Sequence, residues 1–357
     1  MQRRSFIKKA AAATAGAIAA PYILPSGKLF AATGSRIVNH VVLCLFAGGV
    51  RNFESVHKAE GNLMPFTLTG NERINPQIAH AMDELPGSSQ KSLQQYGTLY
   101  KEFRYSQGPT GHFSAHSAVL TGRYTQQNRN IKNYPDTPTL FEYYFRHSPS
   151  PAPAWFVSNA LGPYPTLGFS NHSGYGEKYG AKFIQPAPGI NNTSTGDINN
   201  MLFAGQIIEK YQPELMVVNM LDADICHANF TAYCNNIRKA DYALWQLWQT
   251  IQSTPGMADD TILIALPDHG RNEKPNTIID KQGKYALDHT GDEISRQIFC
   301  LIAGPQNKIV QNQEITTPAG ESIDIVPTVA NILGFNNETP AGLLAGKSLK
   351  QAFVGAV

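Results

Sequence analysis

Acidic and imidazole side chains recur together at the ends of apolar runs in this 357-residue chain. The segment DADICH follows the run 215–221, the segment PDHGRN follows the run 262–266, and the segment LDHTGDE precedes the run 298–303. Carboxylates and neutral imidazoles are the ligands that zinc, manganese and similar divalent cations take in proteins. The three segments contain six candidate metal ligands, which are Asp222, Asp224, His227, Asp268, His269 and His289.

Each acid–imidazole pair has a simpler explanation when it is taken alone, because such pairs also occur in surface turns. Asp222 or Asp224 would also serve as the cap of a following helix, and the sequence leaves open which of them is the ligand. Three pairs beside three apolar runs favour a site for one or two divalent ions, zinc first, with manganese or calcium as alternatives. Two ions held in this way polarise a phosphoryl or sulfuryl oxygen and activate a nucleophile.

A fourth segment, GPTGHFSAHSAVLTGRY, combines hydroxyl groups with two further histidines. It predicts a loop over residues 108–112 and a helix over residues 114–120 that ends at Gly122. The N-terminus of such a helix stabilises an anion through its N–H groups and its dipole. The segment is therefore a candidate anion site.

The reacting group of this segment remains open between hydroxyl and imidazole side chains. Thr110 and Ser114 are candidate nucleophiles, although Ser114 would also be an ordinary N-cap and Thr110 an ordinary loop residue. His112 and His116 are four residues apart, so both project to one side of the first helical turn.

Apolar runs alternate with helical patterns along the chain. The runs are continuous, as in strands that are buried on both faces of a parallel or mixed sheet. The order predicts an α/β fold with a doubly wound, mostly parallel central sheet and helices on both faces. In such sheets ligands bind beyond the carboxyl ends of the strands. The expected strands are 38–46, 152–160, 215–221, 262–266 and 298–303; the expected long helices are 229–253 and 323–333, and residues 162–199 are expected to form loops.

The N-terminus has the pattern of a targeting segment. Arg3 and Arg4 form a pair, and the Ala-rich stretch 10–20 follows. This is the arrangement of a twin-arginine export signal, and the stretch is too short for a stable membrane span. The alternative is a basic tail that contains the pair by chance. We expect a signal over residues 1–33, recognised by the twin-arginine export machinery, and a single domain over residues 34–357 in the periplasm or outside the cell.

Composition excludes some functions. The net charge of +2 depends on five basic residues of the N-terminal segment. Without them, 24 of the 29 lysines and arginines remain against 27 acidic residues, so the rest of the chain is slightly acidic. A nucleic-acid interface needs a basic face, and no basic cluster follows the signal. A disulfide between Cys226 and Cys234 would be compatible with an oxidising compartment, and the sequence leaves it open.

Together the four segments resemble the alkaline phosphatase superfamily, which includes sulfatases, nucleotide phosphodiesterases and cofactor-independent phosphoglycerate mutases. PDHG resembles the family's Asp-His metal pair, HTGDEISRQIFCLIAGP resembles the segment whose histidine, here His289, binds metal, and DADICH resembles the Asp…His pair after a central strand. AVLTGRY and IDIVPTVANILG resemble two sulfatase helices. The leader together with LFAGGVRNFE, GHFSAHSAVLTG and DHGRNEKPN resembles an uncharacterised branch of exported bacterial proteins.

Two positions depart from the family pattern. The family's first strand ends in a metal-binding aspartate, whereas this chain has Ala47 or Gly48 there, and Glu54 is the nearest acid. The nucleophile position falls on His112, so the sulfatase formylglycine mechanism has no cysteine to start from. One ion therefore loses a carboxylate, while the ligands of the other are present.

Two accounts follow from these departures. In the first, the site is rebuilt: His112 is a ligand or the base that accepts the transferred group, and an arginine neutralises the anion. In the second, catalysis is lost and the chain is a periplasmic protein that binds an anion or a partner. We expect the first, an exported metal-dependent hydrolase of small phosphate or sulfate esters. Its candidate catalytic residues are Ser114, Thr110 and His112, and its candidate substrate-binding residues are Arg51, Asn52, His116 and Arg271.

Overall fold

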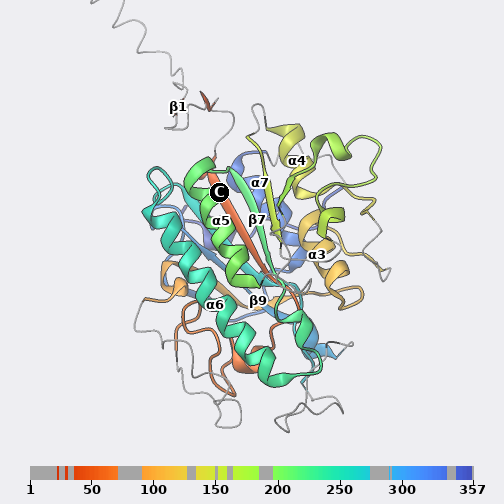
Figure 1. Cartoon of the computed structure of the whole chain (residues 1–357), viewed down its shortest axis with the longest axis vertical. Helices are drawn as coiled ribbons and strands as arrows, with labels where there is room; N and C mark the ends of the chain where they lie inside the picture. Colours follow the sequence, from red (N-terminus) through yellow and green to blue (C-terminus); the bar gives the residue numbers. More distant parts are fainter. Residues whose placement is uncertain are drawn as a thin grey trace, which may run out of the picture.

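A mixed sheet of eight strands forms the centre of the computed structural model (Figure 1). The structure describes residues 22–23, 29–30, 36–70, 91–126, 134–148, 152–158, 164–184, 196–273, 289, 292–335 and 343–355. In spatial order the strands are β10 (Gln313–Ile315), β4 (Gly97–Arg104), β9 (Gln297–Ala303), β8 (Thr261–Pro267), β3 (His40–Phe46), β7 (Leu215–Met220), β5 (Trp155–Ser158) and β6 (Lys182–Ile184).

Strand direction in this sheet is uniform except for β9. β8, β3, β7, β5 and β6 pair in parallel, and β10 pairs in parallel with β4, whereas β9 is antiparallel to both of its neighbours. The start of β9 therefore lies at the edge where the parallel strands end. This places the segment before β9 beside the segments that follow β7 and β8.

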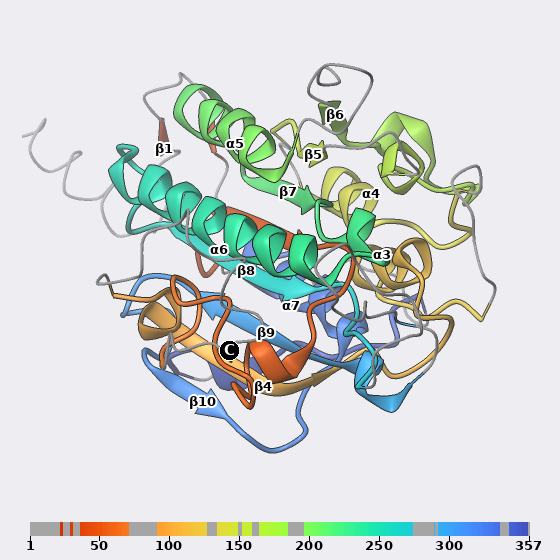
Figure 2. The ribbon, with the colours of Figure 1, turned by 60° about the horizontal axis from the view of Figure 1, so that its bottom comes forward.

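Each face of the sheet is covered by helices, and β3 shows why. Its side chains alternate between two cores: Val41, Leu43 and Leu45 pack in one, and Val42 and Cys44 pack in the other, because successive side chains of a strand point to opposite faces. The first core contains apolar residues of α3 (His112–Thr121), α4 (Leu140–His147) and α7 (Ile325–Leu333). The second contains those of α5 (Asp197–Tyr211) and α6 (Phe230–Ser253), which lie side by side in Figure 2.

Local signals set the helix ends. Asn229 precedes α6, and its side chain accepts a hydrogen bond from the Ala232 amide at 2.9 Å, as an N-cap does. Gly122 and Gly334 end α3 and α7 in the left-handed conformation, at φ 68° and 76°, which costs glycine little. α3 begins at His112 after Gly111, so Ser114 lies inside the helix and is not its N-cap.

The structure confirms the predicted fold class and the five predicted strands. The sequence did not predict β4, β6, β10, α4 and α5, which are labelled in Figure 2. β4 has mixed burial along GTLYKEFR, so it gives no continuous apolar run. Within the predicted loop region, residues 162–163 and 185–195 lie outside the described residues. The described part contains two short 3-10 turns, η3 (Tyr164–Leu167) and η4 (Glu177–Tyr179), together with β6 and the start of α5.

The four cysteines are buried free thiols. Cys226 donates a hydrogen bond from Sγ to the Asp222 carbonyl oxygen at 3.3 Å, and no bridge joins it to Cys234. Most of the predicted signal segment lies outside the described residues; within it, β1 (Tyr22–Ile23) and β2 (Leu29–Phe30) pair antiparallel. Among the described helices, none combines the length and the apolar character that crossing a membrane requires.

Candidate metal site

The four chemistry-bearing segments meet at one edge of the sheet. His227 and Asp224 follow β7, Asp268 and His269 follow β8, and His112 begins α3. The antiparallel direction of β9 brings the preceding His289 to the same edge. The ring centroid of His289 lies 4.2 Å from that of His269 and 4.7 Å from that of His227. The predicted convergence of these segments is therefore present.

Two groups of three side chains have ligand atoms within 4.8 Å of one another. One group consists of His112, His269 and His289, and the other of His112, Asp224 and His227. These atoms are imidazole nitrogens and carboxylate oxygens, the donor set of zinc and related ions. His112 belongs to both groups and is the centre of the cluster.

His112 lies between two carboxylates. Its Nδ1 is 2.9 Å from Asp268 Oδ2, and its Nε2 is hydrogen-bonded to Asp224 Oδ1. Burial on its own would lower the pKa of His112, but the hydrogen bonds and charges of Asp224 and Asp268 outweigh burial and raise the pKa to about 9. Both ring nitrogens are thus engaged, at the position where the family pattern has its nucleophile.

Two other imidazoles, those of His227 and His269, have lowered pKa values and can act as ligands. Burial and the nearby Arg271 charge lower the pKa of His227 to about 4, and burial lowers the pKa of His269 well below its ordinary value. His269 Nδ1 donates to the Gly270 carbonyl oxygen at 2.8 Å, which leaves its lone pair on Nε2. His227 Nε2 is buried and has no hydrogen-bond partner in the part of the chain that the structure describes.

Asp268 is enclosed by hydrogen-bond donors. Oδ1 accepts from the backbone amides of Gly49 at 3.1 Å and His269 at 2.9 Å, and Oδ2 lies 3.5 Å from the Gly48 amide. The residue is fully buried. Burial acts to raise the pKa of Asp268, but the adjacent imidazoles of His269 and His112 outweigh burial and lower it, so the side chain is a carboxylate.

A carboxylate in place of Gly48 or Gly49, after the first strand, has no room in this structure. Gly48 has φ 101°, and a Cβ atom built on it would lie 2.2 Å from the Asp224 amide nitrogen. A Cβ on Gly49 would lie 2.5 Å from the Gly270 carbonyl oxygen and 2.7 Å from His269 Nδ1. Both glycines are therefore required by the close approach of the β7 and β8 loops, and no side chain fits at either position.

Arg271 connects these loops through hydrogen bonds from its buried side chain. The residue is fully buried; Nε donates to the Gly48 carbonyl oxygen at 2.9 Å and Nη2 donates to the Ala223 carbonyl oxygen at 2.6 Å. Its guanidinium lies 4.2 Å from the centre of the Tyr233 ring. Arg271, expected to bind substrate, is instead held inside the protein, where its charge satisfies backbone carbonyl groups.

Two more predicted substrate-binding residues have partners elsewhere. Arg51 is 4% exposed and pairs with Glu54 at 2.7 Å and with Glu60 at 2.8 Å. The two carboxylates give the guanidinium its counter-charge, which removes the reason for it to bind an anionic ester. The Asn52 amide donates to Gln297 Oε1 at 2.9 Å, and the residue is buried.

His116 supports His112 from inside the fold. Its Nδ1 donates to the His112 carbonyl oxygen at 2.7 Å, and its Nε2 lies 2.7 Å from Asn219 Oδ1. The side chain is fully buried, so the expected contact with substrate is not available to it. Asn219 is a supporting residue that sequence reasoning missed, because an asparagine inside an apolar strand gives no signal of its function.

The remaining predicted site residues lie around this cluster. Thr110 Oγ1 donates to the His289 carbonyl oxygen, and Ser114 is fully buried. Asp222 accepts a hydrogen bond from the Asp197 amide at 2.9 Å, at the start of α5. Of the two aspartates that the sequence left as alternative ligands, Asp224 lies in the cluster and Asp222 does not.

Tyr233 is a buried residue of α6 that contacts two charged groups. Its hydroxyl accepts from the Arg51 amide at 3.0 Å and donates to Glu54 Oε1 at 2.9 Å, while its ring faces Arg271. Tyr233 therefore connects the buried Arg51–Glu54 pair to the buried guanidinium of Arg271. Its helical spacing matches a core residue, so the sequence carried no signal of this contact.

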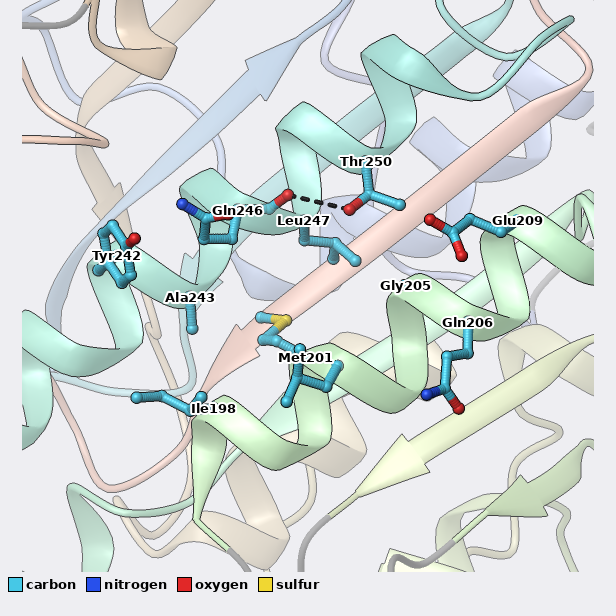
Figure 3. Close-up of a pocket in the computed structure, with 11 residues that line it drawn as sticks. Ile198, Met201, Gly205, Gln206, Glu209, Tyr242, Ala243, Gln246, Leu247 and Thr250 are labelled. Atoms are coloured by element: carbon cyan, nitrogen blue, oxygen red, sulfur yellow. Dashed lines mark hydrogen bonds between the residues drawn. The ribbon is translucent and has the colours of Figure 1, made fainter.

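A hollow of about 370 Å³ lies between α5 and α6 (Figure 3). Apolar side chains such as Ile198, Met201 and Leu247 line it. None of the candidate ligands belongs to this lining. The chemistry-bearing residues therefore form a separate feature at the strand ends.

Solved structures share this architecture. A protein from Vibrio parahaemolyticus that is described as a member of the alkaline phosphatase superfamily aligns over 96% of this chain and 80% of its own, with a TM-score of 0.55 and 16% identity. The fold is that of the alkaline phosphatase superfamily. A phosphonate monoester hydrolase from Silicibacter pomeroyi aligns over 87% of this chain and 76% of its own, with a TM-score of 0.54 and 13% identity.

A 2-O GAG sulfatase also aligns with this chain, over 87% of it and 73% of the sulfatase, with a TM-score of 0.55 and 13% identity. No family sequence model matches the chain. No curated protein matches it by sequence. The likeness is therefore one of fold, and the function must be argued from the site.

Proposed function

We propose that this chain is an exported, metal-dependent hydrolase of phosphate or sulfate esters. The observation that carries the proposal is the meeting of four imidazoles and two carboxylates at the carboxyl edge of the sheet. This is the edge at which doubly wound folds bind their ligands. Structural neighbours that hydrolyse phosphonate monoesters or sulfate esters support the same class of reaction.

The donor set fits a divalent ion. Neutral imidazoles of His227 and His269 and the carboxylate of Asp224 are suited to zinc or manganese. His227 Nε2 is buried without a hydrogen-bond partner among the described residues, and an ion would satisfy it. An ion bound here would polarise an ester oxygen and lower the pKa of a bound water. The chain's own residues would position the ester around it.

The described residues of the cluster differ in exposure. The side chains of His227 and Asp224 are 34% and 25% exposed, whereas those of Asp268 and His269 are fully buried. An ester therefore approaches past His227 and Asp224. The first turn of α3 begins at His112 on the same corner, and its N–H groups and dipole favour the anionic oxygens of a phosphate or sulfate.

The attacking group in this proposal is water. His112 has both ring nitrogens engaged by carboxylates, and the Thr110 hydroxyl donates to the His289 carbonyl oxygen. Ser114 is fully buried. A solvent molecule on the exposed side, held near the neutral His227 imidazole, reaches the ester without displacing any of these contacts.

Export is part of the proposal. The Arg3–Arg4 pair and the Ala-rich stretch after it support delivery to the periplasm by the twin-arginine machinery. Replacing both arginines with lysine is expected to leave the protein in the cytoplasm. Export of the double variant at the wild-type level would contradict this part of the proposal.

Hydrolysis is tested with the purified mature protein, loaded with zinc or manganese and assayed on aryl phosphates, phosphodiesters and aryl sulfates. At least one class should be turned over, and His227→Ala combined with His289→Ala should remove the activity. His57→Ala combined with His147→Ala is the matched control, because these histidines pair with Glu102 and Tyr175 away from the cluster.

Three outcomes are informative in this assay. Activity that survives the His227 and His289 double substitution would show that the ligand assignment is wrong. Metal binding without turnover of any ester class would support the alternative, a catalytically inactive periplasmic protein that binds an anion or a partner. Absence of metal binding would contradict both.

A further inference from the structure

The outer face of α5 carries exposed apolar side chains beside the hollow that separates it from α6 (Figure 3). We propose that this face binds a second copy of the chain, with the two α5 helices antiparallel about a twofold axis. Leu202 of each copy inserts into the hollow of the other. The inference goes beyond ester hydrolysis and does not depend on it.

Exposed apolar side chains are concentrated on α5. Five large hydrophobic side chains are exposed among the described residues, and four of them belong to this helix: Ile198 at 43%, Leu202 at 60%, Phe203 at 40% and Tyr211 at 38%. Single exposed apolar residues are ordinary on a protein surface. Four on one surface helix form a patch of the kind that marks an interaction site.

The hollow provides the recess into which such a side chain fits. Gly205, near the middle of α5, lines it together with Met201 and Leu247. A Cβ atom on Gly205 would meet only the Thr250 side chain, at an ordinary contact distance of 3.7 Å. Glycine is unfavourable inside a helix, and the packing of this chain does not require it here. Its absence of a side chain deepens the hollow and lets a second helix approach closely.

Charge favours a second copy that runs antiparallel. The exposed charged residues of α5, Glu209 and Lys210, lie in its last turn. An antiparallel neighbour places Glu209 beside the first turn of the other α5, where the helix dipole favours a carboxylate. Asp197 in that turn is buried, and it accepts from the amides of Leu221 and Asp222. A parallel neighbour would instead bring the two Glu209 carboxylates together.

The same charges disfavour a lipid surface as the occupant. Helices that lie in a membrane interface have a polar face rich in lysine and arginine. The exposed polar residues of α5 that accompany the apolar group are Asn199, Gln206, Glu209 and Lys210, whose charges cancel. This face is therefore matched to a protein surface that is itself apolar and neutral at its centre, as the face of a second copy is.

The size of the face predicts a weak dimer. α5 has 15 residues and is therefore about 22 Å long, and α5 and α6 side by side are about 20 Å wide. Two such faces have a combined flat area of about 900 Å², just below the usual range of specific interfaces, which begins at about 1,200 Å². A dissociation constant in the micromolar range is expected.

The association is tested by sedimentation equilibrium of the purified, metal-loaded mature protein over about 1 to 500 µM. A monomer that converts to a dimer across this range is expected. A monomer at every concentration would overturn the inference, and so would a dimer that forms independently of α5. Binding of that monomer to phosphatidylglycerol vesicles would assign the face to a lipid surface instead. Ester hydrolysis, measured separately, stands or fails without reference to this result.

Variants of α5 locate the interface. Leu202→Glu should weaken dimerisation about 100-fold, since it removes an apolar anchor and adds like charges near the twofold axis. Gly205→Met should weaken it at least about tenfold by filling the hollow without adding charge. Val354→Glu is the matched control, because Val354 is 50% exposed but lies outside α5, with its amide bonded to the Lys308 carbonyl oxygen. Folded Leu202→Glu or Gly205→Met protein that dimerises as the wild type does would overturn the inference.

Single cysteines test the direction of packing. The four native cysteines are buried, so a new surface thiol is distinguished from them. A cysteine at Gln206, near the middle of α5, should form a disulfide between copies on mild oxidation, whereas a cysteine at Glu209 should not. Efficient cross-linking at Glu209 with none at Gln206 would overturn the antiparallel arrangement.

Discussion

Replacing Gly48 by alanine should force apart the two loops that hold the site. The new Cβ would lie 2.2 Å from the Asp224 amide nitrogen and 2.6 Å from the Ala223 carbonyl carbon. Real Cβ atoms stay at least 3.0 Å from such atoms, so the backbone at Asp224 must move by about 0.8 Å. Asp224 is a proposed ligand, and a displacement of that size is enough to weaken ion binding.

The free-energy cost of this substitution has two parts. An alanine held at φ 101° costs about 1–3 kcal/mol, and forced overpacking against backbone costs about 1–3 kcal/mol more. We therefore expect Gly48→Ala to lower the free energy of unfolding by about 4 kcal/mol. The measurement is urea unfolding followed by circular dichroism, together with metal content after dialysis.

Gly256→Ala provides a matched control for the backbone strain. Gly256 has φ 85°, and no atom lies within 4 Å of a Cβ built there. This variant carries the cost of the left-handed conformation without a clash and should lose only about 1 kcal/mol. If Gly48→Ala is no less stable than Gly256→Ala and binds its ion normally, the proposed contact between the two loops is refuted.

Other perturbations give equally direct tests. Arg271→Gln should lower the free energy of unfolding by about 3 kcal/mol, because buried carbonyl groups at Gly48 and Ala223 lose charged donors. A decrease of less than about 1 kcal/mol, measured by urea unfolding, would contradict this role. Burial raises the pKa of Asp241 to about 7. The contribution of Asp241 to the free energy of unfolding is therefore full below about pH 4 and is lost as the pH rises through about 7, a change of up to about 4 kcal/mol. The free energy of unfolding, measured from about pH 4 to 8, should show this decrease in the wild type and not in Asp241→Asn. Chelation should lower the melting temperature of the wild type, since an ion at 100 times its Kd stabilises by about 2.7 kcal/mol, and should not change that of His227→Ala.

The sequence by itself determined the framework of the fold. Continuous apolar runs identified five of the strands, because a strand that is buried on both faces has apolar side chains at nearly every position. Gly122 marked the end of its helix correctly, since such a cap depends on the local backbone conformation. The acid–imidazole segments at strand ends also located the site, because strand order and direction bring such ends together.

Tertiary structure alone decided what each polar residue contacts. Arg51 and Arg271 had the chemistry of anion-binding groups in the sequence, but both donate to backbone carbonyl oxygens of distant segments, Arg51 to Glu273 and Arg271 to Gly48. The choice between Asp222 and Asp224, two residues apart, depended on which one faces α5. Such outcomes follow from the approach of loops far apart in sequence, which residue type and spacing do not encode.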